Sequence, residues 1–148
     1  MKKVFLYFGV FFFILSNLLT AQNNPNKQKT GNLTIIVSAL QNNKGNVRIG
    51  LFNSKESYSE KEQLFKGAKI KVENKKVKWH VNNIPFGEYA IKAFHDEDSN
   101  DKIDTNFFGI PTESYGFSNN AKALFGPPSF DKAKFTFNKQ DMQIEIKF

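Results

Sequence analysis

A short acidic segment between residues 96 and 104 has the residue types and spacing of a cation-binding loop. Asp96, Asp98 and Asn100 alternate with other residues, and Asp104 follows at the ninth position of the same segment. Calcium loops of the Asp-x-Asp-x-Asn type place oxygen ligands at these positions, because calcium prefers hard oxygen donors. The main-chain carbonyl of Lys102 stands at the seventh position, where such loops supply a backbone ligand. The spacing therefore predicts calcium binding.

Two positions depart from that pattern. The sixth position is Asp101, where calcium loops carry glycine, and the twelfth is Phe107, where they carry a bidentate glutamate. A bidentate acid would have to come from elsewhere in the chain, and Glu113 is the nearest candidate. The alternative is a solvated acidic turn, since the segment carries five acidic residues against the single Lys102.

An aromatic segment rich in glycine and proline follows the acidic one, at residues 107–130. A connection of this length is usually functional or folded on itself. One interpretation is a binding surface for a sugar or peptide, with aromatic rings and side-chain amides supplied by Tyr115, Phe117, Asn119 and Asn120. The other is a satellite core that clamps the loop to a sheet.

Residues suited to catalysis do not assemble into a complete set. His95 beside Asp96 could act as a general base and the carboxylate that orients it, but adjacent strand residues point to opposite faces. Ser118 lacks the sequence pattern of a nucleophile elbow and a helix to follow it. We therefore expect a protein that is not an enzyme, with a carboxylate-dependent hydrolase kept as the alternative.

The composition excludes several kinds of functional site. The chain has 148 residues, a net charge of +7 and no cysteine, so disulfide frameworks, cysteine zinc sites and thiol catalysis are excluded. The excess of basic over acidic residues does not indicate nucleic-acid binding, because the lysines between residues 69 and 78 occupy the polar, solvent-facing positions of predicted strands. A solvated lysine face that protects strand edges is the expected interpretation.

The N-terminus has the features of a secretory signal peptide. Met1-Lys2-Lys3 is a basic start, residues 5–19 are mostly apolar, and Thr20-Ala21 precede a polar run. We expect cleavage after Ala21, a flexible leader over residues 22–31, and a mature chain with no transmembrane segment; an uncleaved anchor is the alternative. The expected location is the periplasm or the cell exterior.

From residue 32 the period of the apolar residues is two, which indicates strands. The predicted strands lie at residues 33–38, 47–51, 70–72, 77–81, 89–93, 135–137 and 144–148. Turn residues between the first two strands predict one hairpin, and those between the third and fourth predict another. A short helix is expected over residues 54–65, with a capping box formed by Ser57 and Glu60.

These elements predict a single domain over residues 32–148: an all-β, antiparallel β-sandwich of about seven strands, with one short helix and a long aromatic loop. Side chains expected to point inward are Leu33, Ile35, Val37, Ile49, Trp79, Tyr89, Ile91, Phe135 and Ile144.

Several long, ordered motifs carry a family resemblance: Gly87-Glu88-Tyr89-Ala90-Ile91, the acidic run from His95 to Asn106, Gly109-Ile110-Pro111-Thr112-Glu113, Tyr115-Gly116-Phe117-Ser118-Asn119-Asn120 and Gly126-Pro127-Pro128. On these motifs, residues 33–148 resemble the secreted bacterial family catalogued as domain of unknown function 2141 (DUF2141). The resemblance implies an exported single domain similar to transthyretin-like and carboxypeptidase-regulatory β-sandwiches, which are immunoglobulin-like in architecture. It implies no activity and no catalytic residue.

Together these observations predict an exported binding or structural module of the bacterial envelope or cell exterior, stabilised by calcium at the acidic loop. Its expected partner is an envelope protein or a glycan. Two alternatives stay open. One is the hydrolase already named, and the other is an accessory subunit of an envelope complex whose partner carries out the chemistry.

Overall fold

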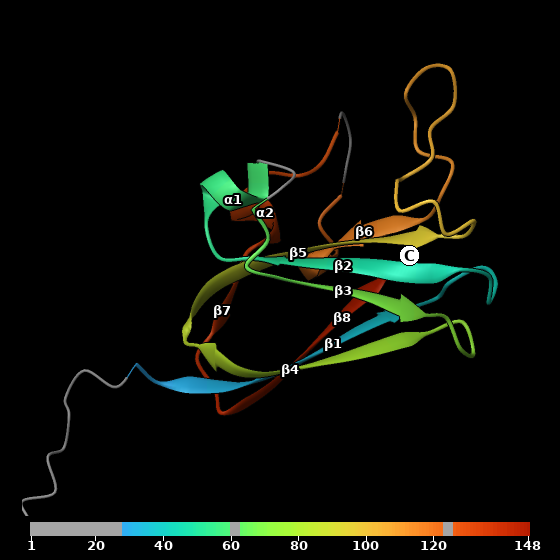
Figure 1. Cartoon of the computed structure of the whole chain (residues 1–148). Coiled ribbons are helices and arrows are strands. Elements are labelled where there is room, and N and C mark those ends of the chain that lie inside the picture. Colours follow the sequence, from blue (N-terminus) through green and yellow to red (C-terminus); the bar gives the residue numbers. More distant parts are fainter. Residues whose placement is uncertain (1–27, 60–62, 123–125) are drawn as a thin grey trace, which may run out of the picture.

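The computed structural model describes residues 28–59, 63–122 and 126–148 (Figure 1). The predicted signal peptide, residues 1–21, lies outside these ranges, as does most of the predicted leader. The last two residues of that leader, Thr30 and Gly31, belong to the first strand. No helix among the described residues has the length and hydrophobicity needed to cross a bilayer.

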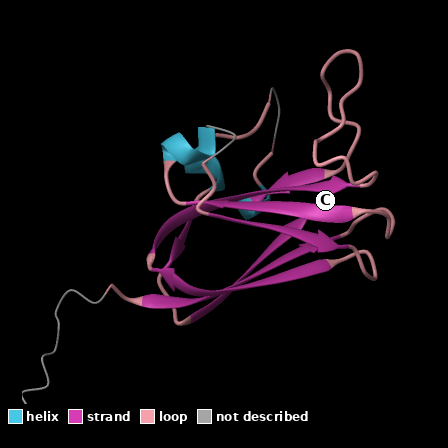
Figure 2. Cartoon of the chain, viewed as in Figure 1, coloured by secondary structure: helices cyan, strands magenta, loops and turns pink. Residues whose placement is uncertain are grey.

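Two β-sheets face each other in a sandwich (Figure 2), which confirms the predicted all-β fold. The strands are β1 (Thr30–Ser38), β2 (Asn46–Phe52), β3 (Lys66–Lys71), β4 (Val77–Pro85), β5 (Gly87–Asp96), β6 (Tyr115–Phe117), β7 (Phe135–Phe137) and β8 (Asp141–Lys147). The short helices are α1 (Lys55–Ser59), the 3-10 turn η1 (Ser118–Asn120) and α2 (Phe130–Ala133). Strand β6 is the element that the alternation did not reveal, because it lies inside the aromatic segment.

The strand order places distant parts of the chain together. One sheet has the order β4-β1-β8, and the other has the order β3-β2-β5-β6, with β7 also paired to β5. Strands β1 and β8 run parallel, with Ile35 opposite Ile144, whereas the sequence predicted antiparallel pairing throughout. Two parallel strands need a long crossover connection. Here the chain forms the whole second sheet after β1 and before it returns as β8.

Both predicted hairpins are wrong. Strands β1 and β2 belong to different sheets, and so do β3 and β4. The turn between Glu73 and Lys76 does form, with two backbone hydrogen bonds of 3.2 and 3.0 Å and positive φ values at Asn74 and Lys75. Beyond this turn the two strands separate, because each pairs more extensively with a strand of its own sheet.

The main core lies between the two sheets. All the predicted inward-facing residues except Trp79 and Ile144 are buried there. Those two side chains are half-buried and pack against the core from its margin, so they point inward as predicted without being fully buried. The alternation assigned their faces correctly, but the facing sheet does not cover them completely.

A second apolar cluster lies on the outer face of the five-stranded sheet, where α1 and α2 cover it. Its buried members are Phe52, Tyr58, Ala90, Phe117, Phe130 and Ala133. Helix α1 is shorter than the predicted helix over residues 54–65, and Ser54 rather than Ser57 caps it. The Ser57 N–H donates to Ser54 Oγ at 3.1 Å, and the Ser54 N–H donates to Ser57 Oγ at 3.3 Å. The predicted partner Glu60 lies outside the described residues.

Candidate functional site

The acidic segment begins at Asp96, the last residue of β5, and continues into the loop that connects β5 to β6 and projects from one end of the sandwich (Figure 1). Strands β5 and β6 are antiparallel neighbours, with Phe94 opposite Tyr115, so the two ends of the loop lie side by side. Glu113 joins them. One of its carboxylate oxygens accepts the Glu97 N–H at 2.8 Å, and the other accepts the Asp104 N–H at 3.0 Å.

The connection between β1 and β2 packs against the same loop. The Asn42 side-chain amide donates to the Glu97 carboxylate at 2.8 Å. Gly45 has a φ of +57°, and a Cβ at this position would lie 2.0 Å from the Asp96 carbonyl oxygen. Only glycine permits both this backbone conformation and this approach. The start of the acidic loop is therefore held both by Glu113 and by the connection between β1 and β2.

Three carboxylates converge at the base of the loop. Oxygen atoms of Asp96, Asp98 and Glu113 lie within 4.8 Å of one another. Asp96 is fully buried and Glu113 nearly so, whereas Asp98 is exposed. Asp96 Oδ2 accepts the Asp101 N–H at 3.2 Å, but Asp96 Oδ1 has no hydrogen-bond partner within the described part of the chain. A buried carboxylate oxygen without a partner is costly, and a bound cation would remove that cost.

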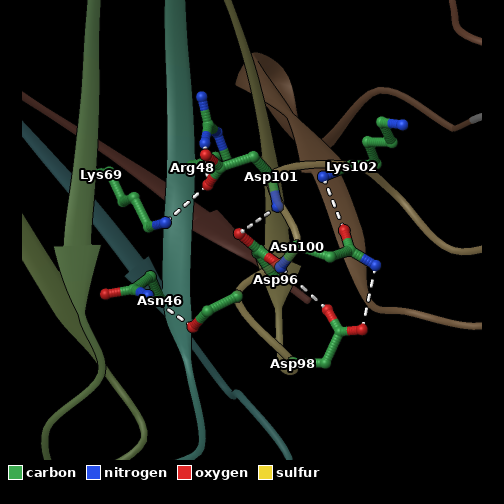
Figure 3. Close-up of polar contacts among 9 residues, drawn as sticks. Asn46, Arg48, Lys69, Asp96, Asp98, Asn100, Asp101 and Lys102 are labelled. Carbon is green, nitrogen blue, oxygen red and sulfur yellow. Dashed lines mark hydrogen bonds and ion pairs between the residues drawn. The ribbon is translucent and has the colours of Figure 1, made fainter.

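Asn100, also a predicted ligand, lies beside this cluster (Figure 3). Its side-chain amide donates to Asp98 at 2.9 Å and to Asp104 at 3.0 Å. Its oxygen accepts the Lys102 N–H at 2.8 Å. The structure thus brings Asp96, Asp98 and Glu113 together directly, while Asn100 connects Asp98 to Asp104 and to the Lys102 backbone.

Asp101 turns away from the cluster and forms ion pairs with Lys69 and Arg48 on neighbouring strands (Figure 3). The hydrogen bond from Lys69 and then that from Arg48 lower the pKa of the Asp101 carboxyl below its ordinary value. The backbone of Asp101 has a φ of +68°, the left-handed conformation for which calcium loops use glycine at their sixth position. Aspartate tolerates this conformation, so its presence there does not disrupt the turn.

His95 and Asp96 have separate partners. The fully buried His95 imidazole donates through Nε2 to the Lys44 carbonyl at 2.7 Å, and its Nδ1 lies 3.6 Å from a Glu97 carboxylate oxygen. An imidazole placed this way supports the β1–β2 connection. It has no exposed face for a substrate.

The predicted ligand-binding residues divide between the second apolar cluster and a shallow cavity. Phe117 is buried and Tyr115 half-buried in the cluster, with their rings 5.9 Å apart. The Asn119 amide donates to the Lys134 carbonyl at 2.7 Å, and the Asn120 side-chain oxygen accepts the Lys147 N–H at 3.0 Å. A cavity of about 300 Å³ opens beside Tyr115, Phe117, Asn120, Lys122 and Lys147. Both amides connect elements of the fold, and of the two residues only Asn120 lines the cavity.

Two residues of the aromatic segment have a different environment that sequence reasoning missed. Phe107 and Phe108 are exposed to 97% and 82%, while Phe117 and Phe130 of the same segment are buried. The available signal was the turn sequence from Asn106 to Gly109, which places the two phenylalanines at the tip of a hairpin.

The fold and this loop define the protein as a β-sandwich domain with a carboxylate cluster at one end. The family model described as "Uncharacterized protein conserved in bacteria (DUF2141)" matches residues 35–145, and the chain belongs to this family. The matched range includes the whole carboxylate cluster. No curated protein and no solved structure matches the chain.

Proposed function

We propose that the protein is an exported binding or structural module whose loop between β5 and β6 takes up calcium. The observation that carries the proposal is the buried Asp96 Oδ1, which lacks a hydrogen-bond partner in the described structure and belongs to a cluster with Asp98 and Glu113. Calcium takes six to eight oxygen ligands, which carboxylates, amide oxygens and water can share. Asn100 and Asp104 supply further oxygens beside the cluster.

Calcium would stabilise the base of the loop. The Glu113 carboxylate already connects both sides of that base through backbone hydrogen bonds. A cation beside it would offset the repulsion between the three carboxylates without replacing those bonds. Because the ion binds the folded loop and not the unfolded chain, binding would add directly to the stability of the domain.

Export and a relationship to transthyretin-like and carboxypeptidase-regulatory β-sandwiches are parts of this proposal. The basic start and apolar stretch of residues 1–21 support export. The turn at residues 84–89, which carries the chain from β4 in one sheet to β5 in the other, supports the relationship. The intact mass of protein recovered from the cell envelope tests the export step: a chain beginning at Gln22 is expected, and retention of Met1 would indicate an anchor instead.

A binding or structural role, with an envelope protein or glycan as partner, is favoured over hydrolysis by the environment of the candidate catalytic residues. His95 is buried against the Lys44 carbonyl. The Ser118 hydroxyl is fully buried and donates to the Ala133 carbonyl at 2.5 Å. Neither side chain has the exposure that a general base or nucleophile needs to meet a substrate.

Thermal unfolding with calcium or with a chelator tests calcium binding. A calcium concentration one hundred times the dissociation constant should stabilise the fold by about 2.7 kcal/mol and raise the melting temperature by several degrees. Asp96→Asn and Asp98→Asn should each remove most of that rise. The control is Glu73→Gln, because Glu73 is an exposed acid on the turn between β3 and β4.

Calorimetric titration of the same variants with calcium separates direct binding from a general salt effect. Heat of binding that Asp98→Asn abolishes and Glu73→Gln preserves would support the proposal. Superimposable melting curves in calcium and chelator, at low ionic strength and without a heat of binding, would contradict it and would identify the loop as a solvated turn.

A further inference from the structure

The tip of the loop between β5 and β6 carries three large apolar side chains in solvent. Phe107, Phe108 and Ile110 are exposed to 97%, 82% and 58%. The two phenylalanine rings meet edge to face, with 5.5 Å between their centroids. An exposed apolar group of this kind, gathered on a segment that stands off the sandwich (Figure 1), indicates a contact site.

The tip is a hydrogen-bonded hairpin, and its turn places the two phenylalanine rings on the outside. The Asn106 side-chain oxygen accepts the backbone N–H groups of Phe108 at 2.9 Å and Ile110 at 3.1 Å. The Asn106 and Ile110 backbones also pair, and Gly109 closes the turn with a φ of +74°. This arrangement matches the three-residue hairpin loop that ends in a left-handed residue. The exposure of Phe107 and Phe108 therefore follows from the turn itself.

The size of the tip limits what can cover it. The two aromatic rings present about 300–500 Å² together, at roughly 150–250 Å² for each, and Ile110 adds less than one further ring. A stable protein interface buries about 800 Å² on each partner. The tip alone is thus too small for such an interface.

The absence of charged side chains at the tip favours a lipid surface as its binding partner. Residues 105–112 carry no charged side chain, so this part of the hairpin can leave water without burying a charge. Apolar and aromatic side chains are the ones that enter the boundary between headgroups and acyl chains. We propose that Phe107, Phe108 and Ile110 insert into the interfacial region of a lipid bilayer.

Insertion does not depend on the calcium of the proposed function, because Glu113 and Asn106 hold the hairpin without an ion. Neutral lipid is the appropriate probe, since the acidic base of the loop would repel anionic headgroups. Any binding through the apolar residues 5–19 is common to all variants of the full chain, so the test must report on the tip itself.

The experiment uses Phe108→Trp and vesicles of phosphatidylcholine in the presence of chelator. The tip tryptophan should shift its emission to the blue on vesicle addition and should be quenched by brominated acyl chains. The wild-type chain, whose only tryptophan is Trp79 on β4, supplies the baseline.

Flotation with the same vesicles measures the contribution of the tip to affinity, on chains that begin at Gln22 so that the apolar residues 5–19 add no binding of their own. The double variant Phe107→Ser, Phe108→Ser should bind at least tenfold more weakly than the wild type, with an unchanged melting temperature because both rings are exposed. Leu64→Ser is the control, since Leu64 is 47% exposed and lies outside the loop.

Unchanged emission and no quenching of the tip tryptophan would overturn the inference, as would equal vesicle binding by the double-serine variant and the wild type. Either result would leave the calcium proposal standing, because that proposal is judged by heat of binding and melting temperature without lipid. Conversely, loss of the calcium effect with retained quenching would contradict only the calcium site.

Discussion

A carboxylate oxygen of Glu113 accepts the backbone N–H of Asp104 at 3.0 Å, although Glu113 follows Asp104 by nine residues. The other oxygen accepts the Glu97 N–H at 2.8 Å. One nearly buried side chain thus joins the two sides of the loop between β5 and β6. The hairpin over residues 105–111 therefore extends from a loop base that Glu113 holds together. The carboxylates of Asp96 and Asp98 lie beside Glu113 at this base.

Removal of Glu113 should therefore destabilise the domain even without an ion. Glu113→Ala leaves two backbone N–H groups without their charged acceptor and should lower the free energy of unfolding by about 3 kcal/mol. Glu113→Gln keeps one acceptor and should cost less. Urea unfolding in chelator measures both, with Glu73→Ala as the exposed control. Equal stability of Glu113→Ala and the control would mean that the loop base is not closed in this way.

Ser118 should contribute to stability through its hydroxyl. It accepts the Ile91 N–H at 2.8 Å and donates to the Ala133 carbonyl at 2.5 Å, and so connects η1 to β5 and to α2 inside the fold. Ser118→Ala leaves both backbone groups unpaired in a buried site and should cost about 3 kcal/mol. Ser129→Ala is the matched control, since Ser129 makes no side-chain cap hydrogen bond at α2 and should change stability by less than about 0.5 kcal/mol.

Two buried tyrosines should respond oppositely to loss of the hydroxyl. The Tyr58 hydroxyl has no hydrogen-bond partner among the described residues, whereas the Tyr89 hydroxyl donates to the Pro85 carbonyl at 2.8 Å. Tyr58→Phe should leave the free energy of unfolding unchanged or raise it by up to about 1 kcal/mol, and Tyr89→Phe should lower it by about 1 kcal/mol. A loss of similar size in both variants would contradict this assignment.

Alkaline stability should depend on Tyr58. Burial raises the pKa of the Tyr58 hydroxyl from 10.0 to about 12. The unfolded chain therefore releases this proton first, and stability that is complete below pH 10 should be lost as the pH rises towards 12. Burial also raises the pKa of Tyr89. Urea unfolding between pH 9 and 12 should show a shallower loss for Tyr58→Phe than for the wild type, with Tyr89 contributing to the loss that remains.

The two inward-facing isoleucines of β8 should contribute unequally to stability, because they are buried to different extents. Ile146 is fully buried, and Ile144 is half-buried at the margin of the core. Ile146→Ala should cost about 2–5 kcal/mol, and Ile144→Ala should cost clearly less. Urea unfolding of the two variants checks this order. The reverse order would contradict the deeper burial of Ile146 in the core.

Residues of one type within the aromatic segment illustrate what local sequence cannot distinguish. Phe117 and Phe130 pack beneath α1 and α2, while Phe107 and Phe108 stand in solvent at the hairpin tip. All four occur among glycine and proline, so composition assigns them one common role. Their separation depends on where β6 pairs with β5, because that pairing places Phe117 opposite Lys92, on the face that α1 and α2 cover, and leaves residues 107 and 108 beyond the paired strands.

The sequence by itself determined the properties that depend on neighbouring residues. Alternation of apolar and polar side chains located most of the strands and the faces that they bury, since a strand repeats every two residues. The family was recognisable from its motifs, and the spacing of the acidic residues located the loop where carboxylates gather. The turn from Glu73 to Lys76 formed for the same local reason.

The tertiary structure alone decided which strands are neighbours and which acids meet. Alternation is compatible with any partner, so it could not show that β1 and β2 separate into different sheets or that β8 lies parallel to β1. Spacing suggested Asp96, Asp98, Asn100 and Asp104 as a group and Glu113 only as a candidate. The pairing of β5 with β6 brings Glu113 back to Asp96, because it joins the two ends of the loop in space and not along the chain.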